Sequence, residues 1–396
     1  MGSSVPKGPI GVALVGGGRW ARVIAGVLLE IPNVAIRVHT TSNAHGMQEW
    51  ARERAADRIE ISSAWPDAAA LPPAAVIVAN ASHDHAGAAA AALREGLPTL
   101  VEKPLALSEA GAADLIALAH RHAALLAISR VPLFARYLER FAHEAARRPR
   151  AQAAQIIWED PRAEQRYGEA KRYDPRLPVL TDALPHVLAI LRTLCGGGLA
   201  CLGLAMTQGG MRTSLQLACG GMPCSVVLAR NSDTRRRTIQ LQTSPEPLRL
   251  DFSQEPGRLT FDGREHDGDP EWNFAPRPLA RMLRTFLGCA ASGTADERLD
   301  AQSAIEECRI ADTAVALYCS RQLEWLAGRL GAPLDYEICY ALSEISCSGG
   351  GRQAPDERTL SLIWAEMGRT GVEAGAAALR DPAGGDEGIR RLLRTA

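Results

Sequence analysis

Residues 10–21 read IGVALVGGGRWA, an apolar run of six residues that leads into three glycines. Residues 19–30 then carry apolar side chains at helical spacing, and the pattern stops before Pro32. This order predicts a buried strand, a tight turn and a helix whose N-terminus faces the turn. The free amide groups of such a helix end attract phosphate. The segment therefore predicts a dinucleotide-binding turn, and the plainer alternative is a glycine-rich connection without a ligand.

Within this segment Gly16, Gly18 and Ala21 form a GxGxxA motif. The first glycine of the motif allows the turn, and the second lets the backbone approach a pyrophosphate. The small third residue lets the helix pack closely on the strand. We expect these three residues, with Arg19 and Trp20 between them, to contact the cofactor.

The alternation of strand and helix continues to about residue 130. Further strands are expected at residues 34–38, 74–79, 99–101 and 125–129, and further helices at residues 85–95 and 108–122. Strands separated by helices of 10–15 residues are typical of a doubly wound parallel sheet. The predicted fold class is α/β, with a Rossmann dinucleotide-binding domain over residues 8–130.

Beyond residue 130 the pattern changes to short strands with few helices between them. These strands are expected at residues 151–159, 198–207, 212–219, 225–229, 238–243 and 258–261. They predict an α+β domain with a mainly antiparallel sheet over residues 131–330, which ends with helices at 278–292 and 299–330. Residues 331–396 are expected to form a C-terminal helical extension with helices at 357–369 and 386–394. Its apolar positions Leu360, Ile363, Trp364 and Met367 are expected to pack on this chain or on a sister subunit.

Composition and charge exclude several classes of protein. The 396 residues are 46% hydrophobic and 22% charged, as in folded soluble proteins, and no apolar run approaches the ~18 residues of a membrane span. With 44 basic and 45 acidic residues the chain lacks the positive charge of nucleic-acid-binding proteins. Nine cysteines without a CxxC pair, and no signal-peptide pattern, indicate a cytoplasmic chain with reduced thiols and no metal site. The expected partner is a small-molecule substrate.

Lysine is rare in this chain, which has only Lys7, Lys103 and Lys171 against 41 arginines. Lys103 lies in the sequence Glu102-Lys103-Pro104, directly after the strand expected at 99–101. Ligands of doubly wound sheets bind at this carboxyl edge. We expect the Lys103 ammonium to hydrogen-bond a substrate oxygen and the nicotinamide ribose. The alternative is an ordinary surface loop.

Residues 181–186, TDALPH, are expected to open a helix with Asp182 as its N-cap. Asp182 and His186 are four residues apart and share one helix face. A histidine near a helix N-terminus is biased toward its neutral form, and a neighbouring carboxylate orients the ring and stabilises its cation. The pair is therefore a candidate acid–base pair, and the alternative is a structural cap with a packed histidine.

The segment after the second strand, His39-Thr40-Thr41-Ser42-Asn43, contains no acidic residue. An acid at this place bonds the ribose diol of NAD and would repel the 2′-phosphate of NADP. The hydroxyls of Thr40, Thr41 and Ser42 can bond that phosphate, so NADP is expected in preference to NAD. A separate basic run, Arg235-Arg236-Arg237, is expected to be a solvated face, with phosphate binding as the alternative.

These motifs together resemble the Gfo/Idh/MocA oxidoreductases, which include glucose–fructose oxidoreductase, inositol dehydrogenase and biliverdin reductase. The resemblance covers about residues 10–330, and it rests on the glycine motif, His85, Glu102-Lys103-Pro104 and Asp182-x-x-x-His186. It implies a Rossmann domain followed by an open-faced sheet that lies against the nicotinamide of NADP or NAD. It also implies a homodimer or homotetramer that forms through the open sheet face.

The resemblance implies roles for individual residues. Lys103, Asp182 and His186 become catalytic, and Asn80, His85 and Glu102 join Lys103 in lining the cofactor. Lys171 and Tyr173 fall in the family's substrate-contacting loop. Two segments depart from the family pattern: Asn80-Ala81 replaces a Thr-Pro pair, and Arg176-Leu177-Pro178 replaces a glycine-rich turn.

The implied reaction is hydride transfer between nicotinamide C4 and a carbinol or ketone carbon of a sugar, a nucleotide-linked sugar or a polyol. His186 takes the hydroxyl proton, Lys103 stabilises the alkoxide and Asp182 holds the imidazole. Two alternatives remain open at this stage. One is an imine reductase of a specialised biosynthetic pathway, and the other is a non-catalytic NADP-binding sensor or subunit. The presence of both Lys103 and His186 argues against the second.

Overall fold

The computed structural model describes residues 10–40, 42–54, 57–65, 74–166, 168–171, 173–348 and 354–381. The chain forms two compact units, each assembled from three stretches of sequence. The first unit takes residues 1–147, 188–194 and 254–309, and the second takes residues 148–187, 195–253 and 310–396. The domain boundaries at residues 130 and 330, drawn from the change of sequence pattern, stay a prediction.

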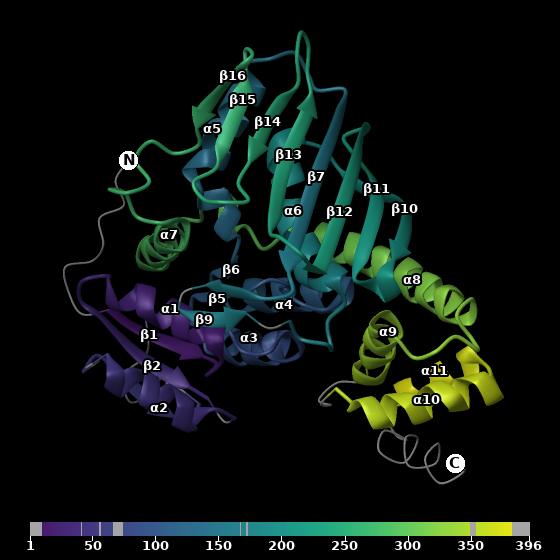
Figure 1. Ribbon diagram of the computed structural model, residues 1–396. Coiled ribbons are helices and arrows are strands. Elements are labelled where there is room, and N and C mark those ends of the chain that lie inside the picture. Colours follow the sequence, from purple (N-terminus) through teal and green to yellow (C-terminus); the bar gives the residue numbers. More distant parts are fainter. Residues whose placement is uncertain are drawn as a thin grey trace. The chain divides into compact units, whose positions relative to one another are not determined.

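The first unit contains a parallel sheet of six strands in the order β3-β2-β1-β4-β5-β6 (Figure 1). The strands are β1 (Ile10–Val15), β2 (Val34–His39), β3 (Ile59–Ser62), β4 (Ala75–Val78), β5 (Thr99–Val101) and β6 (Leu126–Ile128). The helices between them are α1 (Arg19–Leu29), α2 (Ala44–Glu53), α3 (His85–Arg94) and α4 (Glu109–Arg121). Strand order reverses between β1 and β4, and ligands of such sheets bind outside this switch point. The predicted α/β Rossmann architecture is confirmed.

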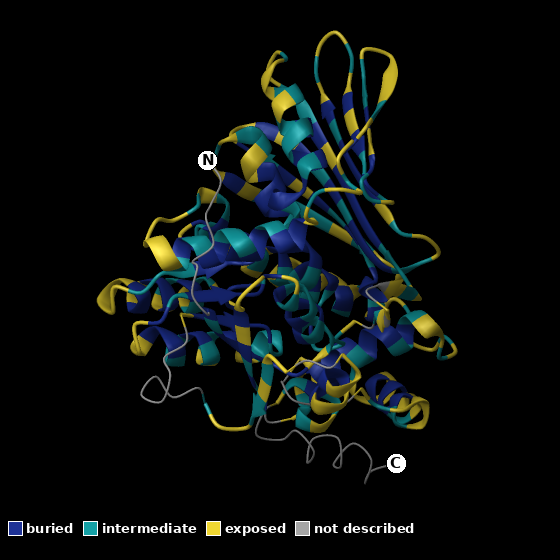
Figure 2. Ribbon diagram, turned by 90° about the vertical axis from the view of Figure 1, so that its left-hand side faces the viewer, coloured by how far each residue is buried: buried dark blue, intermediate teal, exposed yellow. Residues whose placement is uncertain are grey.

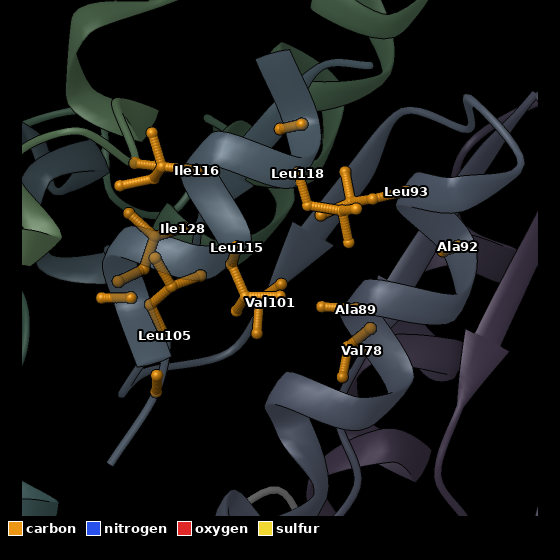
Figure 3. Close-up of a cluster of buried hydrophobic side chains, with 14 of the residues drawn as sticks. Val78, Ala89, Ala92, Leu93, Val101, Leu105, Leu115, Ile116, Leu118 and Ile128 are labelled. Atoms are coloured by element: carbon orange, nitrogen blue, oxygen red, sulfur yellow. The ribbon is translucent and has the colours of Figure 1, made fainter. Parts of the chain in front are cut away.

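Two helices cover one part of this sheet through a continuous apolar cluster (Figure 3). Ala89 and Leu93 of α3 and Leu115 of α4 pack with Val78 of β4 and Val101 of β5, and all five are buried. The small Ala89 side chain lets α3 lie close to the sheet. This packing fixes the carboxyl ends of β4 and β5, where two of the candidate segments begin.

The remainder of the first unit follows β6. It contains the 3₁₀ helices η2 (Val131–Phe134) and η4 (Glu297–Leu299), the helices α5 (Arg136–Ala146) and α7 (Pro278–Ser292), and the hairpin of β15 (Arg258–Phe261) with β16 (Arg264–Asp267). A buried ion pair ties the end of β6 to the start of α8 (Ala304–Ala327), since Arg130 Nη2 lies 2.8 Å from Glu307 Oε1. Burial raises the pKa of Glu307, and the Arg130 guanidinium opposes this shift.

The second unit contains a mainly antiparallel sheet, as predicted. Within this unit the strand order is β10-β11-β12-β7-β13-β14, and one pair, β12 with β7, is parallel. The strands are β7 (Ala153–Pro161), β10 (Leu199–Thr207), β11 (Arg212–Cys219), β12 (Met222–Ser232), β13 (Arg236–Gln242) and β14 (Leu248–Asp251). A small hairpin of β8 (Glu164–Arg166) and β9 (Glu169–Lys171) follows β7. Buried residues alternate with more exposed ones along the long strands (Figure 2).

The helices of the second unit include the first half of α6 (Val179–Cys195), the later part of α8, α9 (Tyr336–Cys347), α10 (Glu357–Thr370) and α11 (Val372–Arg380). The last three lie together beside the end of α8 (Figure 1). Leu360, Ile363, Trp364 and Met367 pack in one buried cluster with α8, α9 and α11, so these apolar positions pack on this chain. The sequence predicted α10 but not α9 or α11. The helix expected at residues 386–394 lies outside the described residues.

Candidate functional site

In the glycine turn after β1, neighbouring atoms leave no room for a side chain at the first two glycines but leave room at the third. Gly16 has a φ of +130°, and a Cβ there would lie 2.6 Å from the Ala79 carbonyl oxygen. A Cβ on Gly17 would lie 2.5 Å from Thr40 Oγ1. A Cβ on Gly18 would meet no heavy atom of the described residues within 4 Å. The protein itself therefore does not demand glycine at residue 18, whereas a ligand against this backbone would.

The N-terminal end of α1 is suited to an anion. Gly18 is the N-cap residue, no side chain caps the helix, and the first turn has no acidic residue. The helix dipole and the amide groups of this end both favour negative charge. Ala21 in the first turn is fully buried, as the motif requires for close packing of α1 on the sheet. Arg19 and Trp20 are half-buried beside it.

The polar segment after β2 packs against the glycine turn. One of its residues, Thr40, was expected to bind a phosphate. Thr40 is buried against Gly17, and its Oγ1 accepts a hydrogen bond from the Asn43 amide. Asn43 Nδ2 donates to the Gly17 carbonyl at 2.6 Å. Ser42 is exposed, and Thr41 lies outside the described residues. Ser42 thus presents an exposed hydroxyl, while Thr40 holds the turn.

His85 links the chain after β4 to the chain after β5. Its ring is buried, with Nδ1 donating to the Pro104 carbonyl at 2.8 Å and Nε2 lying 3.3 Å from the Asn80 carbonyl. Burial lowers the pKa of His85, although these backbone contacts and Glu102 oppose the shift. The lowered pKa favours the neutral ring, whose single N–H at Nδ1 bonds the Pro104 carbonyl, so the predicted cofactor residue His85 ties the start of α3 to the chain after β5.

Asn80 and Lys103 occupy equivalent positions on neighbouring strands. Val78 of β4 pairs with Val101 of β5, and each candidate lies two residues farther along its chain. Asn80 Oδ1 is buried and has no hydrogen-bond partner in the described residues, although Asn80 Nδ2 donates to the Asp84 carbonyl at 3.4 Å. Glu102 is buried beneath this edge and accepts a hydrogen bond from Ser129 Oγ at 2.7 Å.

These residues fit a nicotinamide dinucleotide. Gly18 leaves a surface that a side chain would cover, the adjacent helix end attracts phosphate, and Asn80 Oδ1 is a buried acceptor that lacks a donor. Gly16 touches the backbone of Ala79 and Asn80, so the turn and the edge after β4 are contiguous. The first unit therefore gathers the glycine turn, Asn80 and, through the β4–β5 pairing, Lys103 at one edge of its sheet.

The second predicted motif lies on α6 in the second unit, and its helix begins earlier than expected. The helix starts at Val179, and the Asp182 amide donates to the Pro178 carbonyl at 3.2 Å. Asp182 is therefore in the first turn rather than at the N-cap, and Pro185 lies inside the helix. His186 is one turn farther on, where the field of the helix end is weak. The position of His186 alone no longer favours a neutral imidazole.

The environment of His186 is an aromatic stack. Its ring lies parallel to the Trp158 indole, with centroids 5.1 Å apart and an interplanar angle of 20°. Arg237 stacks on the same indole, 4.0 Å from the ring centroid. Trp158 is a buried residue of β7, so it holds the half-buried imidazole in a defined orientation.

Charged residues next to this stack form ion pairs that the sequence did not predict. Arg237 is buried and pairs with Asp160, which corrects the expectation that residues 235–237 form a solvated face. Lys171 Nζ lies 2.9 Å from Asp160 Oδ1 and 3.8 Å from Glu164 Oε2. Burial disfavours ionisation of Asp160, but Arg237 and Lys171 outweigh it and lower its pKa to about 2. The predicted substrate residue Lys171 thus has a structural partner.

The other predicted substrate residue, Tyr173, lies against a buried arginine. The Arg230 guanidinium stacks 4.9 Å from the centre of the Tyr173 ring, which also contacts the ring of Tyr340. Arg230 Nη2 lies 4.0 Å from Asp182 Oδ2. Burial raises the pKa of Tyr173, and the nearby Arg230 charge opposes this shift. Arg230 was not recognised from the sequence, because the alternating residues that precede it indicate an ordinary strand.

Comparison with known families gives a match for residues of the first unit. Residues 10–129 match the model of the Gfo/Idh/MocA oxidoreductases, a family described as having an NAD-binding Rossmann fold. The matched residues lie within the first unit. The protein is accordingly an oxidoreductase that uses NAD or NADP, and the Gfo/Idh/MocA resemblance stated from the motifs is confirmed. No curated protein matches the chain in sequence.

Solved structures with the same fold include GnnA, KijD10 and GenD2. UDP-N-acetylglucosamine 3-dehydrogenase GnnA from Acidithiobacillus ferrooxidans is 19% identical with a TM-score of 0.63, and the match covers 79% of this chain and 99% of GnnA. The 3-ketoreductase KijD10 from Actinomadura kijaniata, in complex with TDP-benzene and NADP, is 16% identical with a TM-score of 0.63, covering 78% and 97%. GenD2 from gentamicin A biosynthesis, in complex with NAD, is 18% identical with a TM-score of 0.63, covering 80% and 97%. At these identities the likeness shows the fold.

The described residues contain neither a helix that could cross a membrane nor a cluster of metal ligands. No helix there combines the length and the apolar character that a bilayer crossing needs. In the same residues no group of three or more histidine, cysteine, aspartate or glutamate side chains is arranged to hold a metal ion.

Proposed function

We propose that this oxidoreductase interconverts a secondary alcohol and a ketone on a sugar, a nucleotide-linked sugar or a similar polyol. The observation that carries the proposal is the His186 imidazole, stacked on Trp158 and four residues from Asp182, whose carboxylate lies near the buried Arg230. This arrangement provides a proton acceptor with a fixed ring plane and an anion on the same helix face. The nucleotide-sugar enzymes with the same fold support this substrate class.

The chain's own residues handle the proton in this reaction. In the oxidative direction His186 accepts the hydroxyl proton, and the Asp182 carboxylate stabilises the imidazolium that results. The Lys103 ammonium donates a hydrogen bond to the substrate oxygen and stabilises its negative charge. The bound nicotinamide supplies the hydride acceptor or donor at its C4 atom. Reduction of the ketone reverses the proton transfer.

Residues of the first unit would hold the cofactor. The proposed contacts are the backbone of Gly16, Gly18 and Ala21 for the phosphates, Ser42 for a 2′-phosphate, and Asn80 with Lys103 for the nicotinamide half. The absence of an acidic residue from positions 39–43 supports NADP over NAD. Separate titrations with the two cofactors test this preference, and tighter binding of NAD would contradict it.

The experiment that tests the function follows the absorbance of reduced nicotinamide with UDP-linked and TDP-linked hexoses and their keto forms. Once turnover is found, His186→Asn and Lys103→Ala should each lower it by about 10²–10⁴-fold while cofactor binding persists. His120→Asn on the exposed side of α4 is the matched control and should leave turnover unchanged. Retention of turnover in both site variants would show that the assignment of the site is wrong.

We also propose that the protein forms a homodimer or homotetramer through the open face of the mainly antiparallel sheet, as the family resemblance implies. Light scattering on the purified protein measures the assembly directly, and a monomer at micromolar concentration would refute it.

A further inference from the structure

A buried charged group connects the α6 pair, Asp182 and His186, to the C-terminal extension. Arg230 of β12 has a side chain that is 4% exposed. Its Nη1 donates to the Leu177 carbonyl at 2.9 Å and lies 3.8 Å from Glu344 Oε1. Its Nη2 lies 4.0 Å from Asp182 Oδ2 and makes no hydrogen bond in the described residues. The guanidinium therefore lies between a carboxylate of α9 and a carboxylate of α6.

Glu344 is held in place from several sides. Its side chain is 3% exposed, and the hydroxyl groups of Tyr318 and Tyr340 donate to its two oxygens. Gln322 Nε2 donates to Glu344 Oε2 at 3.0 Å and to the Gly209 carbonyl at 3.1 Å. A buried carboxylate with three donors and a cation has little freedom to move. Its position is set by α8 and α9 together.

We propose that Glu344 is a positioning residue for the α6 pair, because it neutralises Arg230 and so leaves the Asp182 carboxylate available to His186. A buried guanidinium stays charged and requires a counter-charge. Asp182 and Glu344 are the two carboxylates with which the structure pairs Arg230. Without the charge of Glu344, Asp182 would be drawn to Arg230 and would support the His186 cation less. The catalytic meaning of this inference rests on the proposed function.

Other charged and titratable groups surround the pair and would be unchanged in the tests. Asp160 on β7 lies in the field of Asp182, and it is paired with Lys171 of β9 and Arg237 of β13. The phenol of Tyr173 lies beside Arg230, as do the two tyrosines that donate to Glu344. None of these groups is removed when Glu344 is replaced, and the three tyrosines stay uncharged near neutral pH because burial raises their pKa values.

The test is a histidine-labelled NMR titration of the protein without cofactor, in which His186→Asn assigns the signal of His186. Glu344→Gln keeps the size of the side chain and removes its charge. We expect the pKa of His186 to fall by about one pH unit in this variant, a tenfold weaker proton affinity. An unchanged pKa of His186 in folded Glu344→Gln would overturn the proposal.

The matched control is Glu366→Gln. Glu366 is a buried glutamate of α10 in the same extension, and its partner is Arg369 rather than Arg230. This exchange should leave the His186 titration unchanged. A fall equal to that in Glu344→Gln would show that any loss of charge in the extension has the same effect, and it would overturn the specific role of Glu344.

Tyr340→Phe provides a second variant if Glu344→Gln does not fold. It keeps the charge of Glu344 but removes the hydrogen bond to Oε1, the oxygen nearest Arg230. We expect a smaller fall of the His186 pKa in the same direction, and no fall would count against the proposal.

In turnover assays both variants should lower kcat more than they change KM, because the substrate contacts remain. The NMR titration does not depend on turnover. Full turnover in His186→Asn would contradict the proposed function, whereas an unchanged pKa of His186 in Glu344→Gln would contradict this inference.

Discussion

At the scale of single residues, the glycine turn separates a requirement of the fold from a requirement of the ligand. Gly16 has a left-handed φ and a backbone oxygen 2.6 Å from the place of a Cβ. Gly18 has a φ of −77° and open space at the same place. A glycine that the fold requires and a glycine that we propose contacts the cofactor are thus two residues apart, and alanine at each position should give opposite results.

Gly18→Ala should leave stability within about 0.5 kcal/mol and weaken cofactor binding by at least about tenfold, because the new methyl group occupies the surface where we place the pyrophosphate. Gly16→Ala should lower the free energy of unfolding by about 1–3 kcal/mol through backbone strain. Denaturant unfolding and cofactor titration measure the two effects. Unchanged cofactor affinity in Gly18→Ala would show that the phosphates bind elsewhere.

At the scale of secondary-structure elements, His85 at the start of α3 bonds the chain after β5 and approaches the chain after β4. Because its pKa is lowered by burial, the folded protein resists protonating a ring that the unfolded chain protonates freely below its ordinary pKa of about 6.5. The unfolded state then binds more protons, so this stabilising contribution is present above that pH and is lost as the pH falls toward the lowered value.

His85→Gln tests this effect, since glutamine cannot take up a proton. The variant should be less stable than the wild type at pH 8, and the difference should narrow at pH 5, where only the wild type bears the cost. Thermal unfolding at both pH values measures it, with His120→Gln on the exposed face of α4 as control. A difference that stays constant with pH would mean that the ring of His85 is not the titrating group.

Elements with a strong apolar period were predictable from the sequence, and elements fixed by tertiary contacts were not. The β1–α1 unit and the cap of α4, where Ser108 Oγ accepts from the Gly111 amide at 3.1 Å, follow local rules. In contrast α2 was not predicted, because its three buried residues, Met47, Trp50 and Ala51, lie in a mostly polar segment. The start of α6 was predicted too late in the sequence, because a proline is usually tolerated only in the first turn of a helix, whereas Pro185 lies inside α6. Packing overrides the local preference there.

In the candidate site the sequence identified the glycine turn, but not the buried charges of the second unit. The ion-pair partners of Arg230, Arg237 and Glu344 are distant from them in the sequence. The parallel pairing of β12 with β7 places Cys224 opposite Ala154, a residue far earlier in the sequence. Local spacing carries no information about such contacts.

At the scale of the whole molecule, the C-terminal extension is part of the core of the second unit. Apolar residues of α9, α10 and α11 form one buried cluster with Leu326 of α8, and Glu344 joins α9 to Arg230 of the sheet. Both the apolar cluster with α8 and the ion pair with Arg230 of the sheet would have to break for the extension to separate from the rest of the unit. The extension should therefore unfold together with the sheet in one transition.

Ile363→Ala, which removes a buried side chain from this cluster, should lower the free energy of unfolding of the second unit by about 2–5 kcal/mol. Hydrogen exchange should then accelerate in β11 and β12 as well as in α10, because the cooperative unit includes both. The glycine turn lies in the first unit, so cofactor affinity at low temperature should be unchanged. If exchange accelerated only in α9, α10 and α11, the extension would be an independently unfolding element, and its contact with Arg230 would not stabilise the sheet.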